Sequence, residues 1–93
     1  MRSRSKVDPR GKAKVFIRTL TYFYTGRVIG QDDREIFLDQ AAWIADTGRY
    51  AQAMATGVFS EVEPYPPEVV VRIQRSAIVE VVGWIHDLPM AQR

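Results

Sequence analysis

The sequence contains no cysteine and only one histidine, and both scarcities limit the chemistry that the chain can carry. Without cysteine, neither a disulfide framework nor a thiolate metal site can form, and nothing indicates secretion. The apolar runs are far shorter than the roughly 18 residues of a membrane span. The N-terminus is charged and lacks the apolar core of a signal peptide. We therefore expect a soluble, cytoplasmic protein without a metal site and without membrane contact.

The net charge of +2 conceals a strong asymmetry. Residues 1–14 carry six basic side chains and one acidic one, whereas residues 15–93 carry seven arginines and ten acidic residues. The basic segment has no apolar periodicity, so we predict a flexible tail over residues 1–13 and a single domain over residues 14–93. The tail is either a solvated terminus or an arm that contacts the phosphates of nucleic acid.

Residues 14–24 are rich in β-branched and aromatic side chains and contain neither glycine nor proline. This composition favours strand over helix. The strand pattern continues over residues 25–31 and contains Gly26 and Gly30, and a glycine inside a strand commonly marks a bend. Residues 32–34 then form a predicted turn. Because a small barrel needs bends in order to close, we predict an all-β fold in which these glycines have a mechanical role.

Residues 41–67 form a long insertion between two strand-rich parts of the chain. The first five residues of the insertion can prolong the strand predicted over residues 35–40. Asp46 can cap a short helix over about residues 47–56, and Gly57 can end it. Three prolines near the end of the insertion forbid pairing in the centre of a sheet.

Two short β-branched runs, residues 69–73 and 78–82, follow the insertion and are separated by a polar link. The last run contains only one charged residue, Glu80. In a monomer it would be an exposed edge strand that is prone to pair with another chain. The apolar segment after it, residues 83–89, is expected to pack against the domain.

Two segments together resemble the bipartite signature of the Sm/LSm/Hfq family, which consists of small bent barrels that assemble into rings and bind RNA. In the first segment, Gly26 is followed six residues later by Asp32 and then by the apolar run Ile36-Phe37-Leu38. Glu35 stands where eukaryal and archaeal members use an asparagine to contact a base. In the second segment, Arg75-Ser76-Ala77-Ile78 resembles the Lys-His-Ala-Ile of bacterial Hfq.

The resemblance covers residues 14–40 and 69–82, and it implies a small, strongly bent, five-stranded open barrel with one short helix in the insertion. It also implies a homo-oligomeric ring of about five to seven subunits, in which the last strand pairs with the sheet edge of a neighbour. Single-stranded RNA would bind near the central pore. The residues implied are Arg34, Glu35, Gln74, Arg75 and Ser76 for RNA binding, and Gly26, Gly30 and Asp32 for structure.

Residue chemistry leaves some alternatives open and disfavours catalysis. Glu35 either accepts a hydrogen bond from a base or pairs with Arg34 or Arg75 and orders the loop. The adjacent Asp32-Asp33 is typical of a turn rather than of a catalytic carboxylate pair, and a lone His86 beside a tryptophan is typical of packing. We therefore expect no enzymatic activity and no cofactor.

The remaining aromatic residues and the acidic body bear on the choice of partner. Tyr22, Phe23, Tyr24 and Trp43 are predicted to lie in the core or in a subunit interface rather than to stack on bases. Residues 42–49 and 63–66 also resemble small phage and prophage proteins, which favours a bacterial host infected by phage as the setting. The rival to an RNA-binding ring is therefore a phage assembly or adaptor protein that uses the ring for protein contacts.

Overall fold

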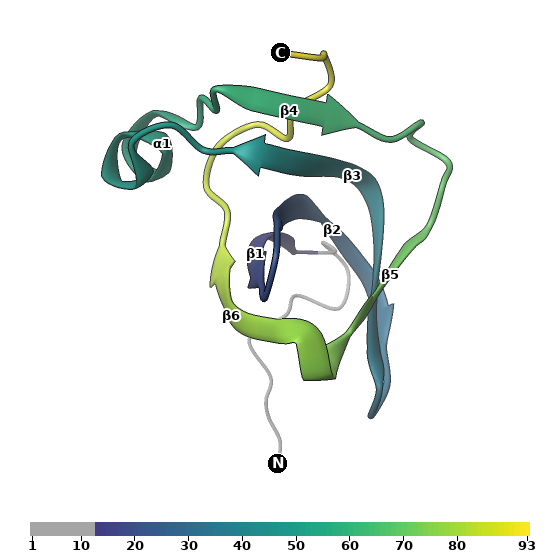
Figure 1. The fold of residues 1–93 in the computed structure, drawn as a ribbon. Helices are drawn as coiled ribbons and strands as arrows, with labels where there is room; N and C mark the ends of the chain where they lie inside the picture. Colours follow the sequence, from purple (N-terminus) through teal and green to yellow (C-terminus); the bar gives the residue numbers. More distant parts are fainter. Residues whose placement is uncertain (1–12) are drawn as a thin grey trace.

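The computed structural model describes residues 13–93, which form one antiparallel sheet of six strands and one short helix (Figure 1). The predicted tail, apart from Ala13, lies outside the described residues. The all-β class is confirmed, but the sheet has six strands where the sequence predicts five, and it is not closed. The elements are β1 (Lys14–Thr19), β2 (Phe23–Gln31), β3 (Glu35–Asp46), α1 (Tyr50–Thr56), β4 (Glu61–Pro64), β5 (Val71–Gln74), the 3-10 turn η1 (Arg75–Ala77) and β6 (Ile78–Gly83).

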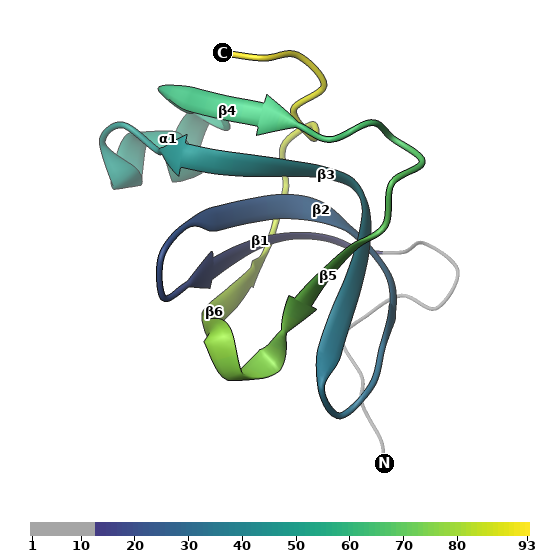
Figure 2. The ribbon, with the colours of Figure 1, turned by 45° about the vertical axis from the view of Figure 1, so that its right-hand side comes forward.

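The long strand β3 determines the shape of the sheet, because its two halves pair with different neighbours (Figure 2). The strand order is β4-β3-β2-β1-β6, and β5 pairs with β3 outside this order. The first half of β3, from Glu35 to Leu38, pairs with β5, whereas the second half pairs with β4. Gln40 lies between the two halves with a φ of 47°, a left-handed conformation that is uncommon for residues other than glycine. The sixth strand, β4, belongs to the insertion and explains the additional strand.

The predicted bends in β2 lie close to its two glycines. The pairing between β2 and β3 shifts register between Thr25 and Arg27, and again between Val28 and Gly30. Such bulges bend a strand and increase its twist. A side chain at Gly26 would place its Cβ 3.0 Å from the Cβ of Leu38, so the close approach of β3 leaves little room for a larger residue there.

The sheet separates two hydrophobic cores. Three consecutive residues of β1 are buried although neighbouring side chains of a strand point to opposite faces, so both faces of β1 are covered. The helix α1 and the segment after β6 supply residues to the second core, which confirms that the apolar C-terminal segment packs down. The first core contains Val15, Ile17, Val28, Ile36, Leu38, Ala41 and Ile73, and the second contains Phe16, Ala42, Ile44, Ala53, Phe59, Val62 and Trp84.

The helix ends where the sequence predicts but begins later. Gly57 adopts a φ of 77° and donates its N–H to the carbonyl of Ala53 at 2.8 Å, as a helix C-terminus requires. The prediction that Asp46 caps the helix is wrong, because Arg49 occupies the N-cap without a side-chain hydrogen bond. Asp46 instead accepts the N–H of Gly48 at 2.8 Å and orders the turn before the helix. Within residues 13–93, no helix is long and apolar enough to cross a membrane.

Candidate functional site

The residues that the family resemblance assigns to RNA binding lie together at one corner of the molecule. We call residues 31–35 and 72–76 the polar corner. The first segment is the β2–β3 turn with its flanking residues, and the second is the end of β5 with the start of η1. Glu35 and Gln74 are direct partners across the β3–β5 pair, and the N–H of Arg75 donates to the carbonyl of Arg34 at 2.8 Å. Two segments far apart in the sequence thus form one surface.

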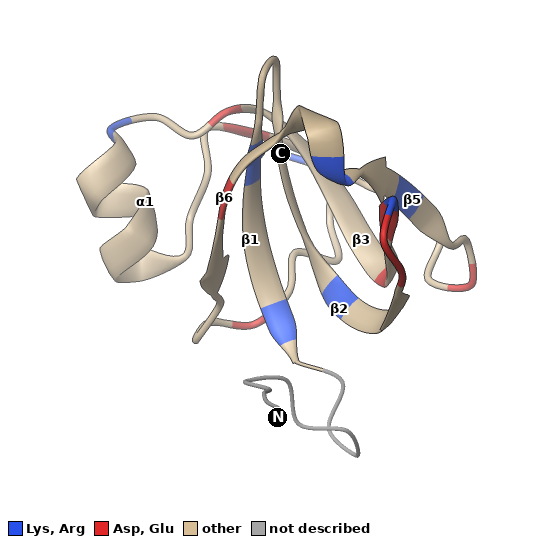
Figure 3. Cartoon of the chain, turned by 90° about the horizontal axis from the view of Figure 1, so that it is seen from below, with Lys and Arg blue, Asp and Glu red and all other residues tan. Residues whose placement is uncertain are grey.

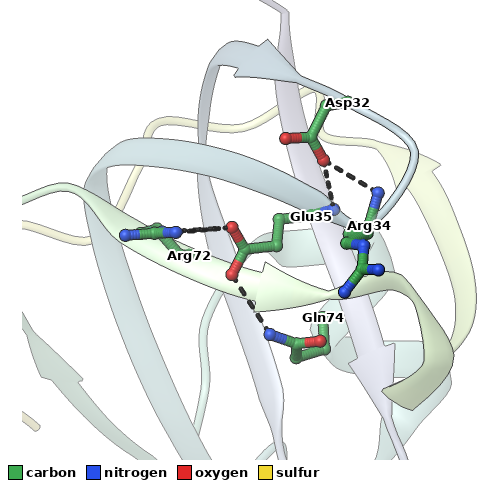
Figure 4. A network of polar contacts seen from close by, with 5 residues as sticks. All are labelled: Asp32, Arg34, Glu35, Arg72 and Gln74. Atoms are coloured by element: carbon green, nitrogen blue, oxygen red, sulfur yellow. Dashed lines mark hydrogen bonds and ion pairs between the residues drawn. The ribbon is translucent and has the colours of Figure 1, made fainter.

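Asp32 orders the turn at the polar corner (Figure 4). One carboxylate oxygen accepts the backbone N–H groups of Arg34 and Glu35, both at 2.8 Å. These two hydrogen bonds, with smaller contributions from the charges of Arg72 and Arg75, hold the pKa of Asp32 below its ordinary value. Asp32 therefore acts on the backbone, as expected of an aspartate at the start of a turn.

The carboxylate of Glu35 is bound by residues of β5, as Figure 4 shows. Arg72 donates to Oε1 from Nη2 at 2.8 Å and from Nε at 3.2 Å, and Gln74 donates to Oε2 at 3.1 Å. The side chain of Glu35 is only 14% exposed. The geometry therefore favours a pairing role for Glu35, but its partner is Arg72 rather than Arg34 or Arg75. The hydrogen bond to Glu35 also raises the pKa of Arg72.

Arg72 is the residue at this corner that the sequence analysis does not identify. Its guanidinium carbon lies 5.8 Å from the centre of the Phe37 ring in addition to its contact with Glu35. A signal was present, because Arg72 stands two residues before Gln74 and therefore on the same face of a strand. Using that signal requires the β3–β5 register, which the sequence does not show.

All three arginines of the polar corner are exposed, but Arg72 is held by Glu35, whereas Arg34 and Arg75 have no carboxylate partner among the described residues. Arg75 donates from Nε to the carbonyl of Asp32 at 2.7 Å and from Nη2 to the side chain of Gln31. Because a guanidinium has five N–H groups, Arg75 keeps donors for a ligand. Within residues 13–93, no hydrogen bond or ion pair holds the side chain of Arg34. Ser76 is exposed in η1.

The formal charges of the polar corner cancel. Three arginines, at positions 34, 72 and 75, stand beside three carboxylates, at positions 32, 33 and 35. Figure 3 shows blue and red segments next to each other around β5 and the start of β3. The corner therefore offers two guanidiniums without a carboxylate partner, those of Arg34 and Arg75, that can contact phosphate or stack on a base, without a broad basic surface around them.

His86 has structural partners rather than a free ring. Nε2 of His86 lies 2.7 Å from the carbonyl oxygen of Met54, and its ring packs edge-on against Trp84. Within the described part of the chain, no group of three or more histidine, aspartate or glutamate residues could hold a metal ion.

The aromatic residues of β2 and β3 do not share one environment. Phe23 packs against the second core, as the sequence predicts. Tyr24 packs against the first core, again as predicted. Tyr24 also lines a recess of about 470 Å³ that is open to solvent, together with Tyr22, Trp43, Glu63, Pro64, Tyr65 and Pro66. The sequence analysis missed this recess because β4 and the prolines that complete it belong to the insertion.

The edge strand β6 exposes apolar side chains. It pairs with β1 on one side, and no strand among the described residues pairs with its other side. Val79 is 51% exposed and Val81 is 44% exposed. The backbone N–H of Trp84 donates to the carbonyl of Lys14 at 2.9 Å, so Lys14 and Trp84 form a hydrogen-bonded pair of the β1–β6 ladder. Because such pairs alternate along an antiparallel ladder, the N–H of Val81 points away from β1 and toward solvent.

Comparison with known proteins does not assign the chain to a family, because no protein-family model, curated protein or solved structure matches it. The likeness to the Sm/LSm/Hfq family therefore rests on the motif residues described above.

Proposed function

We propose that the chain is a non-catalytic Sm-like protein that assembles into a homo-oligomeric ring and binds single-stranded RNA at the polar corner. The observation that carries this proposal is the meeting of the two motif segments at one corner, where Arg34 and Arg75 are exposed. Each contact is weak on its own at physiological salt. A ring repeats the contact once per subunit, and this repetition supplies affinity through multivalency.

The unpaired side of β6 supports the ring. An apolar sheet edge with free backbone groups is a template for strand addition, and a neighbouring subunit can supply that strand. The exposed Val79 and Val81 would then be covered by the neighbour.

The RNA proposal is tested by the affinity of a labelled uridine oligonucleotide, measured by fluorescence anisotropy at several salt concentrations. We expect the double variant Arg34→Ala/Arg75→Ala to bind at least about tenfold more weakly, because the two guanidiniums that have no carboxylate partner are lost. Arg49→Ala, an exposed arginine before α1, is the matched control and should stay within about twofold. Equal affinity of the double variant and the parent would refute the proposed RNA site.

A chain that starts at Ala13 separates the contribution of the basic tail. If the tail adds nonspecific phosphate contacts, the truncated protein should bind all oligonucleotides more weakly and with a shallower dependence on salt. If truncation abolishes binding while Arg34→Ala/Arg75→Ala has no effect, RNA is bound by the tail and not by the polar corner.

The second candidate function is that of an adaptor whose ring contacts other proteins, in a phage or another assembly. The balanced charge of the polar corner and the net charge of −3 over residues 15–93 favour it. An adaptor predicts an intact oligomer that purifies without nucleic acid, which the ratio of absorbance at 260 and 280 nm measures. It also predicts that no oligonucleotide binds at low salt.

A further inference from the structure

The recess lined by Tyr22, Tyr24, Trp43, Glu63 and Tyr65 is separate from the polar corner. It lies against the second half of β3, whereas the corner lies against the first half. Tyr24, Trp43 and Glu63 form a row of direct partners across β2, β3 and β4, so their side chains share one face of the sheet. The volume of about 470 Å³ is typical of ligand sites.

The polar atoms of this aromatic recess are available to a ligand. Within residues 13–93, the hydroxyls of Tyr22, Tyr24 and Tyr65 and the indole N–H of Trp43 form no hydrogen bond. Burial, followed by the neighbouring Tyr65 and Tyr22, raises the pKa of Tyr24, so its hydroxyl stays protonated and can donate. Several donors in a row suit an extended peptide, whose backbone presents carbonyl acceptors at regular intervals.

The charge of the recess selects a cation. Glu63 is its one ionisable carboxylate, and no lysine or arginine lines it. Oε2 of Glu63 accepts a hydrogen bond from Gln92 at 2.8 Å, whereas Oε1 has no partner among the described residues. The faces of the aromatic rings are also negative and attract cations. Phosphate would be repelled here, which disfavours a nucleic acid as the occupant.

Arginine fits these features better than lysine does. Its planar guanidinium stacks on aromatic faces and pairs with a carboxylate, whereas the lysine ammonium is a strongly hydrated point charge. Edge-on packing of Tyr22 against Trp43, with ring centres 4.9 Å apart, supports the aromatic wall. Pro64 and Pro66 restrict the backbone at the rim of the recess, so the rim loses little conformational entropy when a ligand binds.

We propose that this recess binds an arginine side chain of an extended peptide segment of a partner protein. The guanidinium lies against the aromatic rings and pairs with Glu63, while Trp43 and the tyrosine hydroxyls donate to the peptide carbonyls. The proposal does not depend on RNA binding, because none of its residues belongs to the polar corner.

The test uses a fluorescein-labelled peptide of alternating arginine and proline and measures its binding to the full chain by anisotropy. Replacing each arginine by citrulline, a neutral analogue of similar shape, should weaken binding about tenfold or more. Glu63→Gln should weaken binding of the arginine peptide about three- to tenfold and flatten its salt dependence. Tyr22→Ala should weaken binding of both peptides, because it removes part of the aromatic wall.

Glu61→Gln is the matched control, because Glu61 is exposed on the same strand and does not line the recess. The affinity of Glu61→Gln for the arginine peptide should stay within about twofold of that of the parent protein. Circular dichroism of each variant checks that the fold is kept. We expect Glu63→Gln to keep the fold, because Glu63 is exposed. The Arg34→Ala/Arg75→Ala variant should bind the arginine peptide like the parent, which separates this site from the proposed RNA site.

Three results would overturn the arginine-peptide proposal. The first is equal affinity for the arginine and citrulline peptides. The second is unchanged affinity in Glu63→Gln, and the third is no binding at millimolar peptide. If Tyr22→Ala weakens binding of the uridine oligonucleotide instead, the recess is a surface on which bases stack.

Discussion

Two of the three carboxylates of the polar corner act on the protein itself. Asp32 fixes the turn through two backbone N–H groups, and Glu35 joins β3 to β5 through Arg72 and Gln74. The third carboxylate, Asp33, has no such contact among the described residues, and of the three arginines only Arg72 is paired with a carboxylate. The chemistry open to a ligand at the corner is therefore that of the exposed guanidiniums.

Asp32→Ala should destabilise the protein more at neutral pH than in acid. The pKa of Asp32 is lowered by folding, so its contribution to stability is present above the pKa of the unfolded chain, about 3.9, and is lost as the pH falls through the lower folded pKa. Urea unfolding at about pH 7 and about pH 2.5 should show a clear loss for Asp32→Ala only at the higher pH. The neighbouring variant Asp33→Ala is the control, and an equal loss for both would contradict the assigned role.

The sequence is informative about the polar corner up to the point where pairing register matters. The turn at Asp32 is predictable because an aspartate that accepts backbone N–H groups two and three residues later is a local interaction. The partner of Glu35 is not predictable, because Arg72 reaches it only through the β3–β5 register. A shift of that register by one residue would move Arg72 to the other face.

At the scale of the elements, the glycines divide into those that a side chain would disturb and those that it would not. Gly57 adopts a φ of 77°, and a Cβ there would lie 2.6 Å from the Cβ of His86. Gly83 has no atom within 4 Å of the equivalent position. The end of α1 and the segment after β6 therefore meet at Gly57.

Gly57→Ala should lower the free energy of unfolding by about 1–3 kcal/mol, because it adds left-handed strain and a clash with His86. Gly83→Ala should change it by no more than about 0.5 kcal/mol. Thermal or urea unfolding measures both. Equal stability of the two variants would mean that α1 and His86 are not packed together in solution.

The elements differ in how far local sequence determines them. The strands around Gly26 and the turn at residues 32–34 follow from composition and turn chemistry, and so does the helix stop at Gly57. The strand β4 could not be predicted, because its proline-rich surroundings argue against pairing in the centre of a sheet. It forms because it is an outer strand beside β3, and Pro64 stands at its last position.

At the scale of the whole molecule, the sheet is stabilised on both faces, but among the described residues the outer sides of β5 and β6 pair with no other strand. The first core lies against one face, while α1 and the segment after β6 bury the second core against the other. The outer side of β4 is partly paired, because Val62 and Arg93 exchange two backbone hydrogen bonds of 2.9 and 3.0 Å. The outer side of β6 has no such partner among the described residues. The proposed ring would join its subunits through a free strand of this kind, and β6 is the one that exposes Val79 and Val81.

If the proposed ring forms through β6, Val81→Pro should dissociate it without unfolding the subunit. The N–H of Val81 points away from β1, so proline removes a donor from the free side of β6 and leaves the β1–β6 hydrogen bonds in place. Light scattering after size-exclusion chromatography should give a molar mass below that of the parent assembly, and the circular dichroism spectrum should be unchanged. Ile85→Lys is the control, because Ile85 is 84% exposed and lies beyond β6, so the assembly should persist. A monomeric parent protein, or an assembly that survives Val81→Pro, would show that β6 is not the subunit interface.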